Sequence, residues 1–296
     1  MIARSAAVRG GGIRPHRRHE RRGERVEDER APIEPGRLNP DVAHNARVWN
    51  YWLGGKDHYP ADRAVGDRVF GMFPDIVHVA RADRAFLGRA VRHLAGEAGI
   101  RQFLDIGTGL PTVDNTHEVA QRVAPDARIV YVDNDPLVLV HARALLAGTP
   151  EGATDYVDAD ARDTDAILKA AARTLDFDRP VAVMLLGILN FILDTAEARG
   201  IVHRLMDAVP SGSHLVLTHP TLELGGEANA EAMRFWNDHA TPPITARGSR
   251  EIAGFLDGLE VLEPGMVSCS RWRPEFAGPG ELPAEVAQFG VVARKP

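Results

Sequence analysis

Three acidic residues lie at the ends of predicted strands in the middle of the chain. Asp105 lies near the end of one apolar run, Asp133 ends a second, and Asp160 lies at a third strand end, Val157-Asp158-Ala159-Asp160-Ala161. Apolar runs of this length predict buried parallel strands. Because the carboxyl ends of parallel strands meet at one edge of a sheet, these carboxylates are expected to share a site. There they can accept hydrogen bonds from ribose hydroxyls or attract a cation.

A pair of glycines, Gly107 and Gly109, follows the first of these runs. Glycine allows a tight turn whose backbone approaches a ligand closely, and the pattern then predicts a helix from Val113 to Val123. Strand, glycine turn and helix start together form the nucleotide-binding corner of an open α/β sheet. Taken alone, two glycines at this spacing also fit an ordinary turn between a strand and a helix.

The corner could hold NAD or S-adenosylmethionine. The dinucleotide fingerprint requires a third glycine three residues after the second, but Thr112 stands there and Pro111 precedes it. Asp105 would repel a pyrophosphate, whereas it suits a cationic amino group. These residues favour S-adenosylmethionine, and an NAD-dependent oxidoreductase is the less favoured alternative.

Regular alternation of strands and helices must position these residues. Strands are predicted near 101–106, 128–133, 153–158, 180–187 and 213–219, with helices near 113–123, 136–148, 163–175 and 194–209. Short connections between them predict a parallel, doubly wound α/β sheet. Beyond it, helices are predicted at 225–239 and 249–256, and strands near 259–271 and 286–293.

Composition narrows the classes of protein. The 296 residues are 44% apolar and 26% charged, which predicts a globular protein with a sizeable core. A formal net charge of −6 gives no reason to expect a nucleic-acid partner. The single cysteine, Cys269, excludes an internal disulfide and a cysteine-rich zinc site, and no metal is expected. The longest apolar run is too short to span a bilayer and the N-terminus lacks a secretory pattern. We therefore expect a cytoplasmic protein without a membrane partner.

Three regions are predicted. Residues 1–37 are rich in arginine with interleaved acids and lack aromatic residues, which predicts a disordered arm. The arm fits an RNA or membrane contact, but its acids favour an unselected extension. Residues 38–98 are expected to form a helical cap, with helices near 42–53, 61–70 and 75–98. Residues 99–296 are expected to form the α/β domain.

Three motifs carry a resemblance to a known family. They are ARVWNYWLGGKDHYPADR from Ala46, RADRAFLGRAVR from Arg81 and FLDIGTGLPT from Phe103. With the D-x-G-x-G, V-D-x-D-P and D-A-x-D patterns, the chain from about Asn39 to its end resembles the DUF574 group of actinobacterial methyltransferases. That group is part of the class I superfamily that depends on S-adenosylmethionine.

The resemblance implies a Rossmann-like, doubly wound and mostly parallel seven-stranded sheet, whose last two strands form an antiparallel hairpin at one edge. It also implies methyl transfer from S-adenosylmethionine. Asp105 would then lie near the ammonium group. Asp133 would accept hydrogen bonds from the ribose hydroxyls, and Asp160 would accept one from the adenine amino group. Asp133 and Asp160 also fit helix caps. The cofactor-binding residues that it implies are Asp105, Gly107, Thr108, Gly109, Asp133, Asn134, Asp160, Ala161, Leu186 and Gly187.

A general base is needed only if the methyl acceptor must lose a proton. The candidate bases are His58, Tyr59 and His219, and the expected substrate or lid residues are Lys56, Asp57, Tyr59, Asn190 and Trp236. Asn190 lies where amino-methylating enzymes carry D/N-P-P-Y. This chain lacks those prolines, which weakens the case for methylation of nucleic acid.

The leading interpretation is a methyltransferase that acts on a small molecule, such as a secondary metabolite. The alternatives are a sensor or scaffold that binds S-adenosylmethionine without transfer, and a non-methylating reaction assisted by the bound cofactor. A homodimer through the cap helices or the termini is compatible with the sequence, although no heptad or exposed apolar stripe requires one.

Overall fold

The computed structural model describes residues 39–145, 148–275 and 281–296, which fall in one compact unit. The predicted arm at 1–37 lies outside the described residues, as do residues 146–147 of the helix predicted at 136–148, and residue 148 is not helical. The domain boundary at residue 98 stays a prediction.

The parallel strands lie where the apolar runs predicted them. They are β2 (Gln102–Ile106), β3 (Arg128–Asp133), β4 (Ala153–Asp158), β5 (Ala182–Leu186) and β6 (His214–Pro220). The sheet order is β4-β3-β2-β5-β6-β10-β8, so the chain first builds outward from β2 on one side and then continues from β5 on the other. In such a sheet, the crevice where the order reverses is the place where ligands bind.

The C-terminal edge is antiparallel, as expected. Strand β10 (Gln288–Arg294) pairs with β6 on one side and with β8 (Glu260–Val261) on the other. The predicted strand at 259–271 is, however, two short pieces, because a turn in which Gly265 N–H donates to Leu262 O (2.8 Å) separates β8 from β9 (Val267–Ser268). The 3₁₀ turn η3 (Cys269–Arg271) follows β9.

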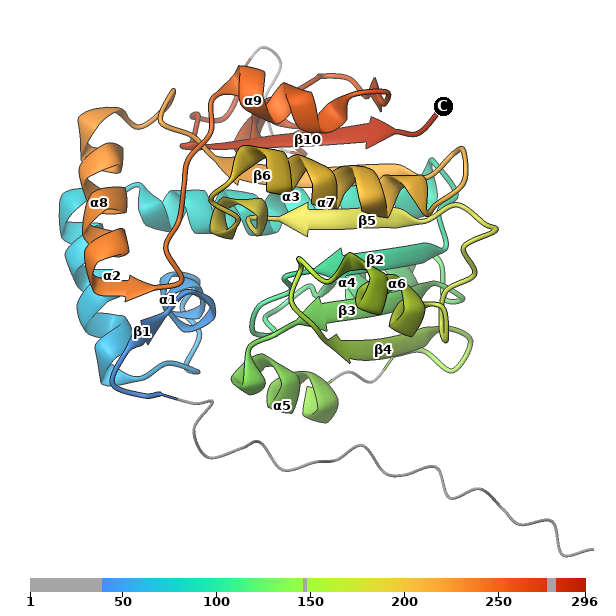
Figure 1. The fold of residues 1–296 in the computed structure, drawn as a ribbon, viewed down its shortest axis with the longest axis horizontal. Helices are drawn as coiled ribbons and strands as arrows, with labels where there is room; N and C mark the ends of the chain where they lie inside the picture. The colour runs from blue at the N-terminus through green and yellow to red at the C-terminus, as the bar shows by residue number, and fades with distance from the viewer. Residues whose placement is uncertain (1–38, 146–147, 276–280) are drawn as a thin grey trace, which may run out of the picture. The chain divides into compact units, whose positions relative to one another are not determined.

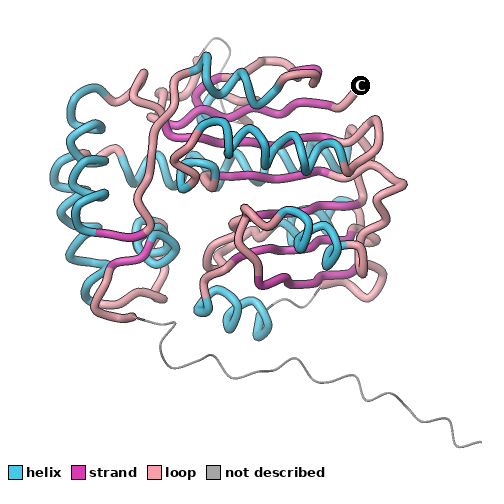
Figure 2. Tube along the Cα trace, in the orientation of Figure 1, coloured by secondary structure: helices cyan, strands magenta, loops and turns pink. Residues whose placement is uncertain are grey.

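Helices cover both faces of the sheet (Figures 1 and 2). One apolar cluster joins strand residues such as Phe103 to the side with α3 (Ile76–Gly96) and α4 (Thr116–Val123). The other joins Leu104 to the side with α6 (Thr164–Ala171) and α7 (Thr195–Asp207). Neighbouring residues of a strand point to opposite faces, which is why one apolar run supplies both clusters. The remaining helices are α5 (Pro136–Leu145) and α9 (Ser249–Ala253), and the short 3₁₀ turns are η1 (Leu189–Phe191) and η2 (Gly254–Leu256).

The N-terminal helices gather beside α8 (Gly226–His239), at one end of the molecule in Figure 1. They are α1 (Asn45–Trp52) and α2 (Pro60–Met72), and α2 packs against α8. The first predicted helix begins three residues later than expected, because Ala43–His44 form a short strand, β1. This strand pairs in parallel with β7 (Ala240–Thr241). No helix within the described ranges is long and apolar enough to cross a membrane.

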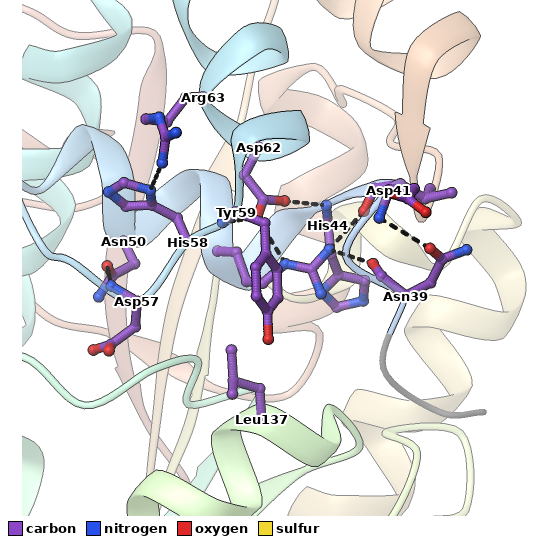
Figure 3. A network of polar contacts seen from close by, with 12 residues as sticks. Asn39, Asp41, His44, Asn50, Asp57, His58, Tyr59, Asp62, Arg63 and Leu137 are labelled. Atoms are coloured by element: carbon purple, nitrogen blue, oxygen red, sulfur yellow. Dashed lines mark hydrogen bonds and ion pairs between the residues drawn. The ribbon is translucent and has the colours of Figure 1, made fainter. Parts of the chain in front are cut away.

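A buried ion pair fixes the cap internally. Arg47 Nε lies 2.9 Å from Asp62 Oδ2, and the two side chains are 4% and 0% exposed. Asp62 also accepts backbone hydrogen bonds from His44 (3.0 Å) and Tyr59 (2.7 Å), as Figure 3 shows. One carboxylate therefore joins β1, α1 and the start of α2.

Candidate functional site

A cavity of about 480 Å³ opens at the carboxyl ends of the parallel strands, between them and the cap helices. It is the place that the reversal of strand order predicts. The residues predicted from the sequence that line it are Asp105, Gly107, Thr108, Gly109, Asp133, Asn134, Asp160, Ala161, Leu186, Gly187, Asn190 and Trp236.

The glycine turn is shaped by two residues with positive φ. Gly107 has φ +77° and Gly109 has φ +63°, a region that side-chain-bearing residues rarely adopt. A Cβ on Gly107 would lie 2.5 Å from Ile188 Cδ1, so this glycine is also required for packing. A Cβ on Gly109 would meet nothing within 4 Å, so the cavity is open at that point.

Asp133 joins the second strand to the glycine turn. Its Oδ2 accepts from Gly109 N–H (2.8 Å) and its Oδ1 from Asp135 N–H (2.9 Å). A carboxylate has about four acceptor positions, so these two bonds fix its orientation and leave capacity for a ligand. Asp160, at the third strand end, accepts from Asn134 Nδ2 (3.2 Å) and pairs with Arg162 (3.3 Å). The Asn134 contact brings the second and third strand ends together.

Asp105 is the most buried of the three predicted acids, at 5% exposure. Its Oδ2 accepts from Thr116 Oγ1 at 2.6 Å. Burial raises the pKa of Asp105 to about 6, although Thr116 and the nearby Arg84 oppose the rise. Burial likewise raises the pKa of Asp133 to about 6, against the hydrogen bonds from Asp135 and Gly109. The site therefore concentrates negative charge where water is largely excluded.

Charged residues that were not assigned a role from the sequence also lie at the site: Asp83, Arg84 and Arg162. Asp83 and Arg84 lie on α3 and both line the cavity. Arg84 donates to Val113 O (3.0 Å) and to Asn115 Oδ1 (3.1 Å), so its guanidinium lies beside the glycine turn. The RADRAFLGRAVR motif contained this signal, but a helical pattern alone does not say which charged residues of the helix face a cavity.

The three candidate bases and the loop after α1 lie elsewhere. None of Lys56, Asp57, His58, Tyr59 and His219 lines the cavity. Within the loop, Asp57 N–H donates to Asn50 Oδ1 (3.1 Å), His58 Nδ1 lies 3.3 Å from Arg63, and the Tyr59 ring points toward Leu137 of α5 (Figure 3). His219 is fully buried, with Nδ1 2.8 Å from Pro220 O and Nε2 2.9 Å from the Arg247 guanidinium.

Comparison with known proteins identifies the family. A family model described as S-adenosyl methyltransferase matches residues 32–296. The chain belongs to the S-adenosyl methyltransferase family. A solved DUF574 family protein from Streptomyces avermitilis is 46% identical, with a TM-score of 0.83, over 87% of this chain and 100% of that one. A candidate methyltransferase from Thermobifida fusca is 41% identical, with a TM-score of 0.80, over 88% and 97% of the two chains. No curated protein matches.

Membership in the S-adenosyl methyltransferase family decides between the two cofactors left open by the glycine spacing. S-adenosylmethionine is the cofactor, and methyl transfer is the reaction. The NAD-dependent alternative is excluded with it, in agreement with Pro111 and Thr112 in place of the third-glycine pattern.

The raised pKa of Asp133 predicts a specific effect of pH on stability. Its pKa is about 6 in the folded protein and 3.8 as the reference value, so the folded state takes up a proton first as pH falls. Wild type should therefore gain stability relative to Asp133→Asn between pH 6 and 4, by about 1 kcal/mol per pH unit. Urea unfolding of both proteins across this range measures the difference. A difference that stays constant with pH would contradict the prediction.

Proposed function

We propose that this methyltransferase transfers its methyl group to a small molecule, and that the strand-end acids hold the cofactor. The observation that carries the proposal is that Asp105, Asp133 and Asp160 all line one cavity. Most of a drug-sized ligand is buried in a pocket of this kind. The single cysteine, Cys269, is buried and unpaired, which supports a cytoplasmic enzyme.

The glycine corner fits the amino-acid end of the cofactor. Asp105 supplies a buried carboxylate for the ammonium group, and the open space over Gly109 admits a ligand close to the backbone. Arg84 supplies a guanidinium beside the same turn, suited to the cofactor carboxylate. The Thr108 hydroxyl also belongs to this turn, and a hydrogen bond to Tyr156 OH (3.1 Å) fixes its orientation.

The neighbouring strand ends fit the adenosyl part. Asp133 retains acceptor capacity for the ribose hydroxyls, and Asp160 with the Ala161 backbone lies beside it for the adenine edge. Leu186 and Gly187, at the end of β5, line the continuation of the cavity toward the cap. In this assignment the adenosyl part lies across β3 and β4, and the reacting methyl group near β5.

The bound cofactor supplies an electrophilic methyl group on a sulfonium. The chain's own task is to align the acceptor with it and to exclude water, and orientation alone can supply about 7–11 kcal/mol of the barrier. The apolar residues of the cap helices along the cavity exclude water from the reacting atoms.

Isothermal titration with S-adenosylmethionine tests this assignment. Asp133→Ala is expected to weaken binding by about 10- to 100-fold, because charge-assisted hydrogen bonds to the ribose are lost. Asp178→Ala, which removes an exposed acid near the opposite edge of the sheet, is the matched control and should bind like wild type. Equal affinity in all three proteins would contradict the role of Asp133.

A further inference from the structure

The half of the cavity that faces the cap is lined largely by apolar side chains. They come from α1, α3 and α8 and from the segments that follow α2 and β7, and we call this half the acceptor chamber: Trp49, Trp52, Phe73, Val79, Trp236 and Ile244. The indole N–H groups of Trp52 and Trp236 donate to Gly66 O (3.2 Å) and Pro242 O (2.9 Å). Both polar groups are thus satisfied by backbone, which leaves ring surface to contact a ligand.

One carboxylate belongs to this chamber. Among the described residues that line the cavity, Asp83 is the acid carried by a helix, whereas Asp105, Asp133 and Asp160 lie on or just after strands. Asp83 is 7% exposed. A buried carboxylate in apolar surroundings is unfavourable unless hydrogen bonds or a cation compensate it. The groups around Asp83 therefore indicate its role.

Two polar side chains hold Asp83 in place. Gln288 Nε2 donates to Asp83 Oδ1 at 2.6 Å and also lies 3.2 Å from Thr218 Oγ1. The same amide would lie 3.8 Å from a Cβ on Gly187, so it is beside the end of β5. Asp83 is therefore positioned, through Gln288, next to the strand end assigned to the methyl group.

The other charged groups around Asp83 do not neutralise it by direct pairing. Arg84 follows it on α3, but the Arg84 guanidinium is hydrogen-bonded to Val113 O and Asn115 Oδ1. Asp105 contributes a second negative charge, and the charge of Asp83 adds to burial in raising the pKa of the Cys269 thiol. Burial raises the pKa of Asp83, against hydrogen bonds from Thr218 and Gln288 and the charge of Arg84.

We propose that Asp83 is the general base of the reaction, and that the acceptor is an apolar molecule whose nucleophile is an amine or a hydroxyl. This inference rests on the proposed function. In the step, the nucleophile's lone pair forms the new bond to the methyl carbon. The sulfur–methyl bond breaks with its electron pair on sulfur, and the proton of the nucleophile passes to an Asp83 oxygen. The products are S-adenosylhomocysteine, the methylated acceptor and the protonated carboxyl group.

Three probes with one ring system test the chamber without knowledge of the natural acceptor. They are 1-naphthylmethylamine, 1-naphthylmethanol and 1-naphthoate, titrated at about pH 8, where they are cationic, neutral and anionic. Trp49, Trp52 and Trp236 line the chamber, so tryptophan fluorescence reports binding. Titrations are made with and without S-adenosylhomocysteine, on wild type, Asp83→Asn and Asp238→Asn. The last removes an equal charge from the exposed face of α8.

Wild type and Asp238→Asn should bind the amine at least about tenfold tighter than the naphthoate, because a buried charge discriminates strongly between opposite ligand charges. In Asp83→Asn, which keeps the shape of the side chain, this preference should disappear while the affinity for S-adenosylmethionine by titration calorimetry is unchanged. A preference that persists in Asp83→Asn, or no binding of any probe to wild type, overturns the inference. Loss of S-adenosylmethionine binding in wild type would instead overturn the proposed function, since the probe preference is measured without it.

Discussion

Replacement of Asp62 by alanine is expected to lower the free energy of unfolding by about 3–5 kcal/mol. Arg47 would keep its buried position and its charge but lose the carboxylate 2.9 Å away. The N–H groups of His44 and Tyr59 would also lose their acceptor. The measurement is urea unfolding followed by far-ultraviolet circular dichroism.

The matched control is Asp67→Ala on the same helix. Asp67 is exposed and accepts a hydrogen bond from Tyr51 OH at 2.6 Å. An exposed interaction of this kind contributes about 1 kcal/mol or less. Similar destabilisation by both variants would show that the buried pair has no special importance. Because α1 and α2 both carry residues that line the cavity, Asp62→Ala should also weaken the binding of naphthylmethylamine.

The second large effect concerns the glycine turn, where two alanine substitutions should act differently. Gly107→Ala should destabilise the protein by about 2–5 kcal/mol, the sum of backbone strain at φ +77° and displacement of Ile188. Gly109→Ala should add only the strain, about 1–2 kcal/mol, because no atom lies within 4 Å of the new Cβ. Thermal unfolding of the two variants measures the difference.

Gly109→Ala, the variant with the smaller expected loss of stability, should nevertheless show a large loss of cofactor binding. The Cβ at residue 109 points into open cavity that the assignment gives to the cofactor. Gly109→Ala should therefore lose S-adenosylmethionine affinity out of proportion to its modest loss of stability. If Gly109→Ala binds the cofactor as tightly as wild type, the amino-acid end of the ligand does not lie at this turn.

The sequence was sufficient to predict the sheet and the residues at its strand ends. Apolar runs set the strands, and parallel strands necessarily deliver Asp105, Asp133 and Asp160 to one edge. This inference needs only local pattern and the general geometry of parallel sheets, which is why it succeeded without knowledge of any contact between distant residues.

The features that the sequence did not predict depend on contacts between distant segments of the chain. The short strand at Ala43–His44 depends on Ala240–Thr241, and no local pattern in either segment predicts the pairing. His219 looked available at a strand end, but Arg247 from a later loop lies against it. Conversely, Asp83 and Arg84 looked like ordinary charges of a helix, and only the packing of α3 on the sheet places them in the cavity.

The pairing of β1 with β7 also has a consequence for the order of assembly during synthesis. Residues 43–44 leave the ribosome nearly two hundred residues before their partners at 240–241. Helix α1 thus waits, without that strand and without Trp236 of α8, until most of the chain has been translated. Contacts of such long sequence separation form late and slowly. The nascent chain can therefore pair its parallel strands β2 to β6 before the wall that receives the methyl acceptor forms, and the antiparallel strands β8 to β10 follow that wall.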